Sequence, residues 1–315
     1  DLTLYDNQIR NIDLGIKEEI DKYNTRAKEE NNPEQYWSLA NEQMNTGKYQ
    51  EAIVNYDKVI ALAPEFGRSY LNRGFCFQKT GLSGAALIDY NKFISLEPND
   101  PYGYFYRAWL HHSQEDYSEA ISDFDNYLKL KPEDAEGYSS RGWAKYYNKD
   151  YMGALSDFNK QIELDESNPI AYYNRGSAKS ELNDHYGAIS DYKKAIELDK
   201  TFSMAYNNMA WSKFNLKKYN DALIDANKAI ELDKENQVAY DSRAEIKFNL
   251  KDYNGCIEDA NTALSLNPKI SNAYFMKARA SYRLGRKRDA CEFWSKAGEL
   301  GKAEAYEYIT KYCNN

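Results

Sequence analysis

The chain has 315 residues and a formal net charge of −8 at pH 7, with an isoelectric point near 5.2. Binding to nucleic-acid phosphates requires a basic surface, so this charge argues against nucleic acid as the main partner. The sequence has 29% charged residues and a mean hydropathy of −0.83. It holds no apolar run near the roughly 18 residues of a membrane helix, so no membrane span is predicted.

Residues 1–32 precede a repeated pattern and do not fit it. Their apolar residues recur at helical spacing, with charged residues between them: Ile9, Ile12, Ile16, Ile20 and Tyr23. We expect this segment to form a helix that caps the exposed face of the first repeat. The alternative is a docking helix, through which the chain would form a homodimer.

From residue 33 to residue 304 the sequence repeats with a period of 34 residues. Position 4 of every repeat is Tyr, position 8 is Gly or Ala, and position 20 is Ala except for Cys256. A fixed internal period of this length is the signature of stacked structural repeats. The predicted units are 33–66, 67–100, 101–134, 135–168, 169–202, 203–236, 237–270 and 271–304.

Proline residues mark where the helices end. All seven fall at position 32 or position 1 of a repeat, and proline is costly inside a helix but tolerated at its first turn. A second break falls near positions 14–16, so each repeat has room for helix A at positions 1–14 and helix B at positions 17–30. After the eighth repeat we expect residues 305–315 to contain the end of a C-terminal solvating helix, because an uncapped terminal repeat exposes apolar surface.

The repeated residues resemble the tetratricopeptide repeat: an aromatic at position 4, Gly or Ala at 8, Tyr at 17, Ala at 20, an aromatic at 24, Ala at 27 and Pro at 32. The resemblance covers residues 33–304. It implies an all-α, right-handed superhelical solenoid of antiparallel helix pairs, with helices A lining a concave face. The small residues at positions 8 and 20 have a physical reason as well, because helices A and B approach closely there.

The resemblance also implies that positions 2, 5, 9, 12 and 13 of helix A face the concave groove. These columns are rich in aromatic residues: Trp37, Phe75, Phe105, Trp109, His112, Trp143, Tyr146, Tyr147, Tyr173, Trp211, Phe214, Phe248, Phe275 and Tyr282. Such side chains either pack against the next helix A or form a floor for an extended peptide or a partner helix. We favour binding, since Trp and Tyr are preferred interface anchors and exposed apolar stripes are unusual.

Charge changes along the same columns near the end of the array. Asp241 and Glu245 occupy the seventh unit, whereas Arg279 and Arg283 occupy the eighth, with Arg286 close by. The basic residues could hold an acidic group of a partner, and the alternative is a solvated last helix. The carboxylate clamp of chaperone-tail-binding members is not reproduced, because no repeat has Lys at position 5 or Arg at position 6. Chaperone C-terminal tails are therefore not the predicted ligand.

A second polar pattern pairs position 7 with position 23. Position 7 carries Arg73, Arg107, Arg141, Arg175 and Arg243, and position 23 carries Asp89, Asp123, Asp157, Asp191, Asp225 and Asp259. Position 7 of the resembled family is commonly apolar. We expect a structural ladder in which each Asp reaches the Arg of its own unit or of the next, rather than a ligand site.

The sequence contains no recognisable catalytic, cofactor or metal motif. The adjacent His111 and His112 cannot share one helix face, and His185 takes an aromatic packing position. The four cysteines show no metal or redox spacing, so we expect packed, reduced thiols and a cytoplasmic location. The alternative is an exported form that has lost a leader, since the first residue is Asp1 rather than Met.

Taken together, these patterns predict a non-enzymatic scaffold or adaptor that binds a protein or peptide, without metal or cofactor. The alternative is a structural protein that self-associates through its N-terminal helix and the ends of the array.

Overall fold

The computed structural model describes residues 32–313, which form seventeen α-helices and, within that range, no strand. The prediction for residues 1–32 therefore falls, apart from residue 32, outside the described residues. The helices are α2 (Pro33–Asn45), α3 (Tyr49–Leu62), α4 (Gly67–Lys79), α5 (Ser83–Leu96), α6 (Pro101–Ser113), α7 (Tyr117–Leu130), α8 (Ala135–Tyr147), α9 (Tyr151–Leu164), α10 (Pro169–Glu181), α11 (His185–Leu198), α12 (Ser203–Asn215), α13 (Tyr219–Leu232), α14 (Gln237–Asn249), α15 (Tyr253–Leu266), α16 (Ser271–Arg283), α17 (Lys287–Glu299) and α18 (Glu304–Tyr312).

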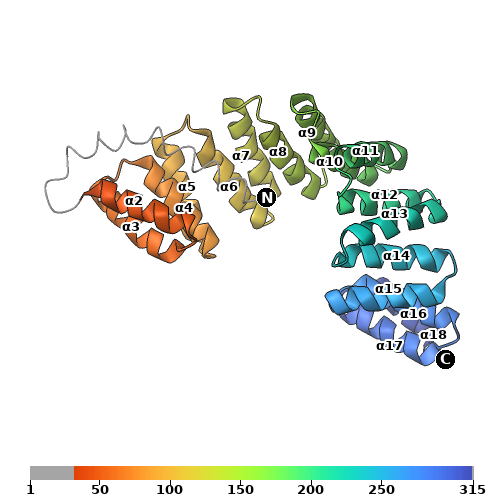
Figure 1. Ribbon diagram of the computed structural model, residues 1–315. Coiled ribbons are helices and arrows are strands. Elements are labelled where there is room, and N and C mark those ends of the chain that lie inside the picture. Colours follow the sequence, from red (N-terminus) through yellow and green to blue (C-terminus); the bar gives the residue numbers. More distant parts are fainter. Residues whose placement is uncertain (1–31, 314–315) are drawn as a thin grey trace. The chain divides into compact units, whose positions relative to one another are not determined.

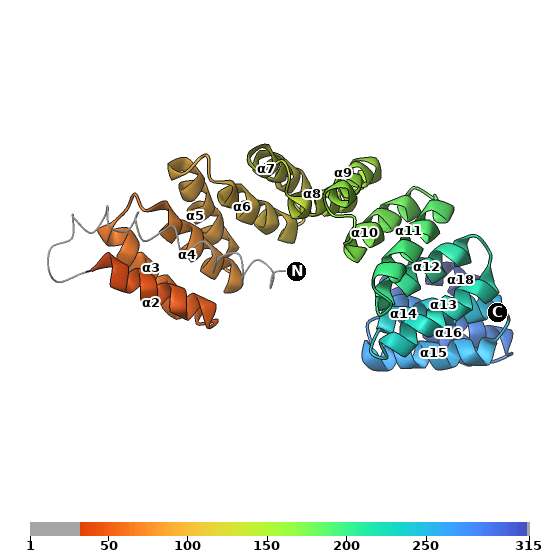
Figure 2. The same ribbon diagram turned by 45° about the horizontal axis from the view of Figure 1, so that its top comes forward.

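The chain divides into two compact units, with the division between Lys149 and Asp150. The first unit contains α2–α8 and the second contains α9–α18, so the division falls inside the predicted unit 135–168. Within each unit, successive helices lie side by side as antiparallel neighbours (Figures 1 and 2). This arrangement confirms the predicted all-α fold of stacked helix pairs.

Helix A begins at position 1 of every repeat, where local chemistry favours a start. The side chains of Asn32, Asp100, Asp134 and Asn168 each accept a hydrogen bond from the backbone N–H two residues later, which satisfies one of the free donors of a helix N-terminus. The turn to helix B needs a positive φ at position 15. Glycine supplies it at Gly47, Gly81 and Gly285, whereas Glu115, Lys149, Asn183, Lys217 and Lys251 adopt it at the other repeats.

Small residues let helices A and B of one repeat approach closely. A Cβ on Gly74 would lie 2.8 Å from the Tyr90 ring, and one on Gly176 would lie 2.7 Å from the Tyr192 ring. The alanines at position 20, such as Ala86 and Ala188, are fully buried. In these two repeats an aromatic ring of helix B thus packs against the backbone of helix A.

The outer face of α2 differs from the matching face of every later helix A. Positions 3 and 10 carry the exposed residues Gln35 and Glu42 in α2. In the other repeats both positions are small or apolar and buried: Ser69, Gly103, Gly137, Ala171, Ala205, Ala239 and Ala273 at position 3, and Cys76, Leu110, Ala144, Ala178, Ser212, Ile246 and Ala280 at position 10. A largely polar outer face is what the end of a stack requires, so α2 needs no apolar cover at these positions.

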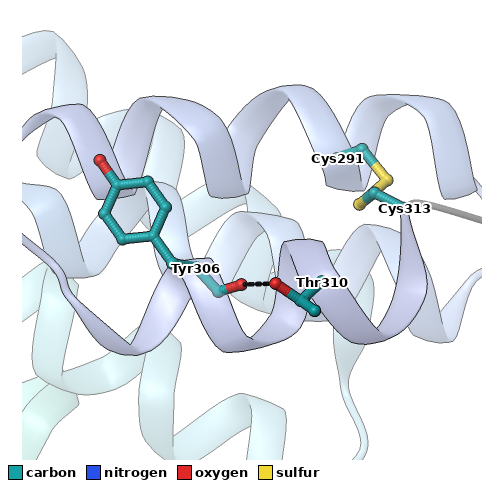
Figure 3. Close-up of a disulfide and its surroundings, with 4 residues drawn as sticks. All are labelled: Cys291, Tyr306, Thr310 and Cys313. Atoms are coloured by element: carbon teal, nitrogen blue, oxygen red, sulfur yellow. Dashed lines mark hydrogen bonds between the residues drawn. A yellow bond between two sulfur atoms is a disulfide. The ribbon is translucent and has the colours of Figure 1, made fainter.

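At the other end, α18 covers the last repeat with aromatic side chains. The rings of Tyr308 and Tyr312 lie 5.2 and 5.9 Å from the ring of Trp294, which is 1% exposed. A disulfide joins Cys291 of α17 to Cys313, directly after α18 (Figure 3). The prediction of reduced thiols is therefore wrong for this pair: the two cysteines are 22 residues apart in the sequence and meet where α18 packs on α17.

The other two cysteines are buried thiols, as expected for packed positions. Burial raises the pKa of Cys76 and of Cys256 to about 12, so neither thiol is ionised near neutral pH.

Candidate protein-interaction surface

Five of the aromatic residues predicted to line a groove lie in the core instead: Trp37, Phe75, Phe105, Phe248 and Phe275 are each at most 8% exposed. The Trp37 ring lies 4.9 Å from that of Phe66, and the Phe105 ring lies 4.9 Å from that of Tyr127. We therefore correct their assignment to a partner-binding floor. At these positions the side chains pack between helices, which is the alternative interpretation of the sequence.

The predicted groove residues of the first unit that are not in the core lie on α6 and α8, and they gather there with Tyr117 at the start of α7. We call them the α6–α8 cluster: Trp109, His112, Tyr117, Trp143, Tyr146 and Tyr147. The His112 ring lies 5.2 Å from that of Trp109 and 5.4 Å from each of Tyr117 and Tyr147. Tyr117 and Tyr147 are stacked at 5.8 Å, and Trp143 lies 5.1 Å from Tyr146. Tyr117 was not among the predicted groove residues, because it occupies the packing position 17.

The cluster is partly open to solvent and carries little charge of its own. Tyr147 is 51% exposed, while His112 and Trp143 are half-buried. Burial lowers the pKa of His112, which keeps its imidazole neutral near pH 7. Its Nε2 atom is buried and makes no hydrogen bond within residues 32–313. The surface therefore combines apolar ring faces with a few polar edges, as protein-binding surfaces do.

The second unit holds a smaller aromatic surface on α12. Trp211 is 37% exposed and stacks on Phe214, with ring centroids 5.1 Å apart. Tyr173 of α10 instead packs on Phe202 at 5.1 Å, and its hydroxyl accepts a hydrogen bond from Asn208. Tyr282, the last predicted residue, packs at 4.6 Å on Tyr312. Of these residues, only the α12 pair presents a large ring face to solvent.

The predicted acid-binding residues occupy different environments. The Arg279 guanidinium lies 4.3 Å from the centroid of the Phe248 ring, a cation–π contact. Arg283 and Arg286 are exposed. The three side chains are therefore available to a partner to different degrees, with Arg279 already covered by an aromatic ring.

Next to Arg279, a chain of polar groups surrounds two partly buried carboxylates. Asn272 donates to Asp241 at 3.0 Å, and Lys302 donates to the other end of the Asn272 amide at 3.1 Å. Burial raises the pKa of Asp241 to about 6 and also raises the pKa of Glu245. In their ionised form, these carboxylates gain less free energy from neighbouring cations than they lose by the removal of water.

The structure joins arginine and aspartate residues across the repeats. In four repeats the arginine at position 7 donates two hydrogen bonds of 2.6–2.9 Å to the aspartate at position 23 of its own repeat: Arg73 to Asp89, Arg107 to Asp123, Arg175 to Asp191 and Arg243 to Asp259. The remaining nitrogen donates to position 25 of the preceding repeat: Asp57, Asn91, Asn159 and Asn227, and Asp125 for Arg141. These four arginines thus each contact two helices B, and the acceptor at position 25 is a partner that the sequence analysis did not include.

Repeat 6 departs from this pattern. It has Met209 at position 7, and its Asp225 pairs with Lys213 at 2.5 Å. Lysine at position 11 also reaches the same aspartate in the neighbouring repeats, where Lys179 lies 2.8 Å from Asp191 and Lys247 lies 2.8 Å from Asp259.

Two features are absent from the part of the chain that the structure describes, residues 32–313. Within that range no group of three or more His, Cys, Asp or Glu side chains is placed to hold a metal ion. In the same range no helix is both long enough and apolar enough to cross a membrane.

Sequence comparison matches this chain to the tetratricopeptide repeat at several places. Residues 34–66, 67–100, 169–202 and 238–270 match in the frame that the prolines indicate. Residues 89–122 and 191–224 match in a frame that starts within helix B. Together these matches cover more than half of the chain. A comparison with curated proteins gave no match.

Solved structures of low sequence identity share the fold. A tetratricopeptide repeat protein from Parabacteroides merdae superposes with a TM-score of 0.67 at 18% identity, over 79% of this chain and 99% of that one. Cut9, in its complex with Hcn1, gives 0.65 at 14% identity, over 84% and 52% of the two chains. Yeast Tom70 gives 0.62 at 18% identity, over 90% and 65%. The repeated sequence matches, over more than half of the chain, show that it belongs to the tetratricopeptide repeat family, whose fold these solved structures share.

Proposed function

We propose that this chain is a non-enzymatic scaffold or adaptor, and that the α6–α8 cluster is its contact surface for a peptide or a partner protein. The tetratricopeptide fold supports protein–protein interaction in general. The observation that carries the proposal is the gathering of six rings on α6–α8, with Tyr147 51% exposed at its edge. Five other aromatic residues of the same helix A columns, Phe105 of α6 among them, are buried, so packing alone does not require exposed rings at such positions.

The α12 surface, Trp211 stacked on Phe214, is a second contact point in the other unit. The exposed Arg283 and Arg286 would bind an acidic group of the partner. Aromatic rings contribute most of the binding energy in such surfaces, whereas exposed charges mainly raise the association rate.

The proposal is tested by identifying a partner and then measuring its affinity for matched variants. The full chain captures proteins from its native source, and one captured protein is purified and titrated by calorimetry. We expect Tyr147→Ala to weaken binding at least tenfold, on the order of 1.4 kcal/mol. Tyr186→Ala is the matched control, because Tyr186 is 66% exposed on the helix B α11.

Equal affinity of both variants for the purified partner would exclude the α6–α8 cluster as the contact surface. Sedimentation of the chain alone addresses the alternative function, self-association. A mass that rises with concentration in the intact chain, and does so equally in Tyr147→Ala, would favour a structural protein over an adaptor.

A further inference from the structure

Repeats 5, 6 and 7 place a lysine ammonium beside a buried aspartate. The Nζ atoms of Lys179 and Lys247 each lie 2.8 Å from the Oδ2 atom of the aspartate at position 23. In repeats 5 and 7 that oxygen also accepts a hydrogen bond from the arginine of the same repeat. One buried carboxylate therefore has two cationic neighbours, which offsets the loss of its hydration.

Repeat 3 has the same aspartate and arginine but lacks the lysine. Asp123 is 4% exposed and binds Arg107, whereas position 11 is His111. The Nδ1 atom of His111 lies 4.0 Å from Asp116, and it is buried without a hydrogen bond among the described residues. The imidazole thus does not replace the ammonium that repeats 5 and 7 supply.

A hollow of about 440 Å³ opens beside these residues. Its lining includes Arg107, His111, Ser118, Glu119, Ser122 and Asp123. Glu119 adds a carboxylate at position 19, where repeats 5 and 7 have Gly187 and Gly255. The hollow therefore contains two carboxylates and two hydroxyl acceptors but one guanidinium, a balance that favours a further cation.

We propose that this hollow is a binding site for the lysine side chain of a partner protein. The partner's ammonium would take the place that Lys179 and Lys247 fill in their own repeats, beside the Oδ2 atom of Asp123. Glu119 and one of the two serines, Ser118 or Ser122, would accept its two remaining N–H groups, and Leu87 would contact the aliphatic part of the side chain. The site differs from the α6–α8 cluster in residues and in chemistry.

The experiment titrates the full chain with Nα-acetyl-lysine N-methylamide and follows the backbone amide resonances of residues 107–123 by NMR. We expect saturable shifts with this probe. The matched control is Nα-acetyl-2-aminoheptanoic acid N-methylamide, in which an uncharged methyl group takes the place of the ammonium and the rest of the side chain is unchanged. We expect it to bind at least tenfold more weakly. Equal responses to the two probes would overturn the proposal.

Three variants separate the site from general effects of charge. His111→Lys supplies the missing ammonium from within the chain, so we expect it to abolish saturable binding and to raise the melting temperature by about 2 °C. His111→Gln leaves the hollow open and should bind the probe within threefold of the unchanged chain. Lys179→His opens the equivalent place in repeat 5, where Arg175 still holds Asp191, and should add shifts near Asp191.

Saturable binding that persists in His111→Lys would contradict the assignment of the hollow. Putrescine provides the last comparison. If it binds more than tenfold more tightly than the lysine derivative, the ligand is a free polyamine and the protein-partner proposal is wrong.

Discussion

At the scale of single residues, Asp241 shows how burial opposes charge in this chain. Its carboxyl group has an amide neighbour, Asn272, and a more distant cation, Lys302. Burial outweighs both and raises its pKa from 3.8 to about 6. The folded state therefore binds this proton more tightly than the unfolded state does, and the free energy of unfolding decreases as the pH rises from about 4 to 6.

Asp241→Asn removes the buried charge while keeping the shape of the side chain. We expect it to raise the free energy of unfolding at pH 8 by on the order of 2 kcal/mol, with most of this gain lost at pH 4. Urea titrations at the two pH values measure the difference. Asp221→Asn, on the exposed side of α13, is the control. An equal gain at both pH values would contradict the burial argument.

Lys217 shows a second single-residue effect, in the backbone. Its φ is +59° in the turn before α13, where three of the repeats have glycine. A side chain in this conformation costs roughly 1 kcal/mol. We expect Lys217→Gly to raise the free energy of unfolding by about 0.5 kcal/mol, whereas Lys217→Ala, which keeps the Cβ atom, should not. Thermal unfolding of the two variants tests this, and equal midpoints would count against strain at this turn.

At the scale of helices, the arginine at position 7 joins helix A to two helices B. Removing it leaves a buried carboxylate, but the consequence depends on what else that carboxylate contacts. We expect Arg107→Leu to lower the free energy of unfolding by about 3 kcal/mol, because it leaves Asp123 buried without a cation. Arg175→Leu should cost less than half as much, since Lys179 remains 2.8 Å from Asp191.

Chemical denaturation of both arginine variants distinguishes these outcomes, which concern the structural role we propose for the ladder. Similar losses in both variants would mean that the lysine contributes nothing. An increase in stability on replacing either arginine would show that leucine packing outweighs the ion pair at that position.

At the scale of the whole molecule, the disulfide between Cys291 and Cys313 restrains the last helix. The closed loop spans 22 residues, and such a cross-link stabilises by about 3 kcal/mol through the entropy of the unfolded chain. We expect Cys313→Ser to speed amide hydrogen exchange in α18 strongly and in α2–α8 not at all, because each repeat contacts only its neighbours. Cys76→Ser, which affects a buried thiol in the first unit, should leave exchange in α18 unchanged.

Hydrogen exchange resolved along the chain measures both variants. Faster exchange in the first unit of Cys313→Ser would show coupling along the entire array. Unchanged exchange in α18 would show that the packing of Tyr308 and Tyr312 on Trp294 holds this helix without the disulfide.

The sequence by itself determined the period, the helix starts and the pairing of helices. Each of these depends on a local constraint that recurs along the chain, such as Tyr at position 4 or a small residue, Gly or Ala, at position 8 of every repeat. The arginine and aspartate columns could be read in the same way, but the sequence left open whether Asp123 binds Arg107 of its own repeat or Arg141 of the next, and the structure pairs it with Arg107. Eight copies of one pattern make such local rules visible without any homologue.

Only the tertiary structure decided which aromatic residues are open to solvent, which cysteines meet and where a hollow remains. Phe105 and Tyr147 occupy helix A positions of the same predicted kind, yet one is 2% exposed and the other 51%. The difference comes from the side chains that neighbouring helices place over each position. The burial of a side chain depends on contacts with residues that are distant in sequence, and the repeated pattern does not specify those contacts.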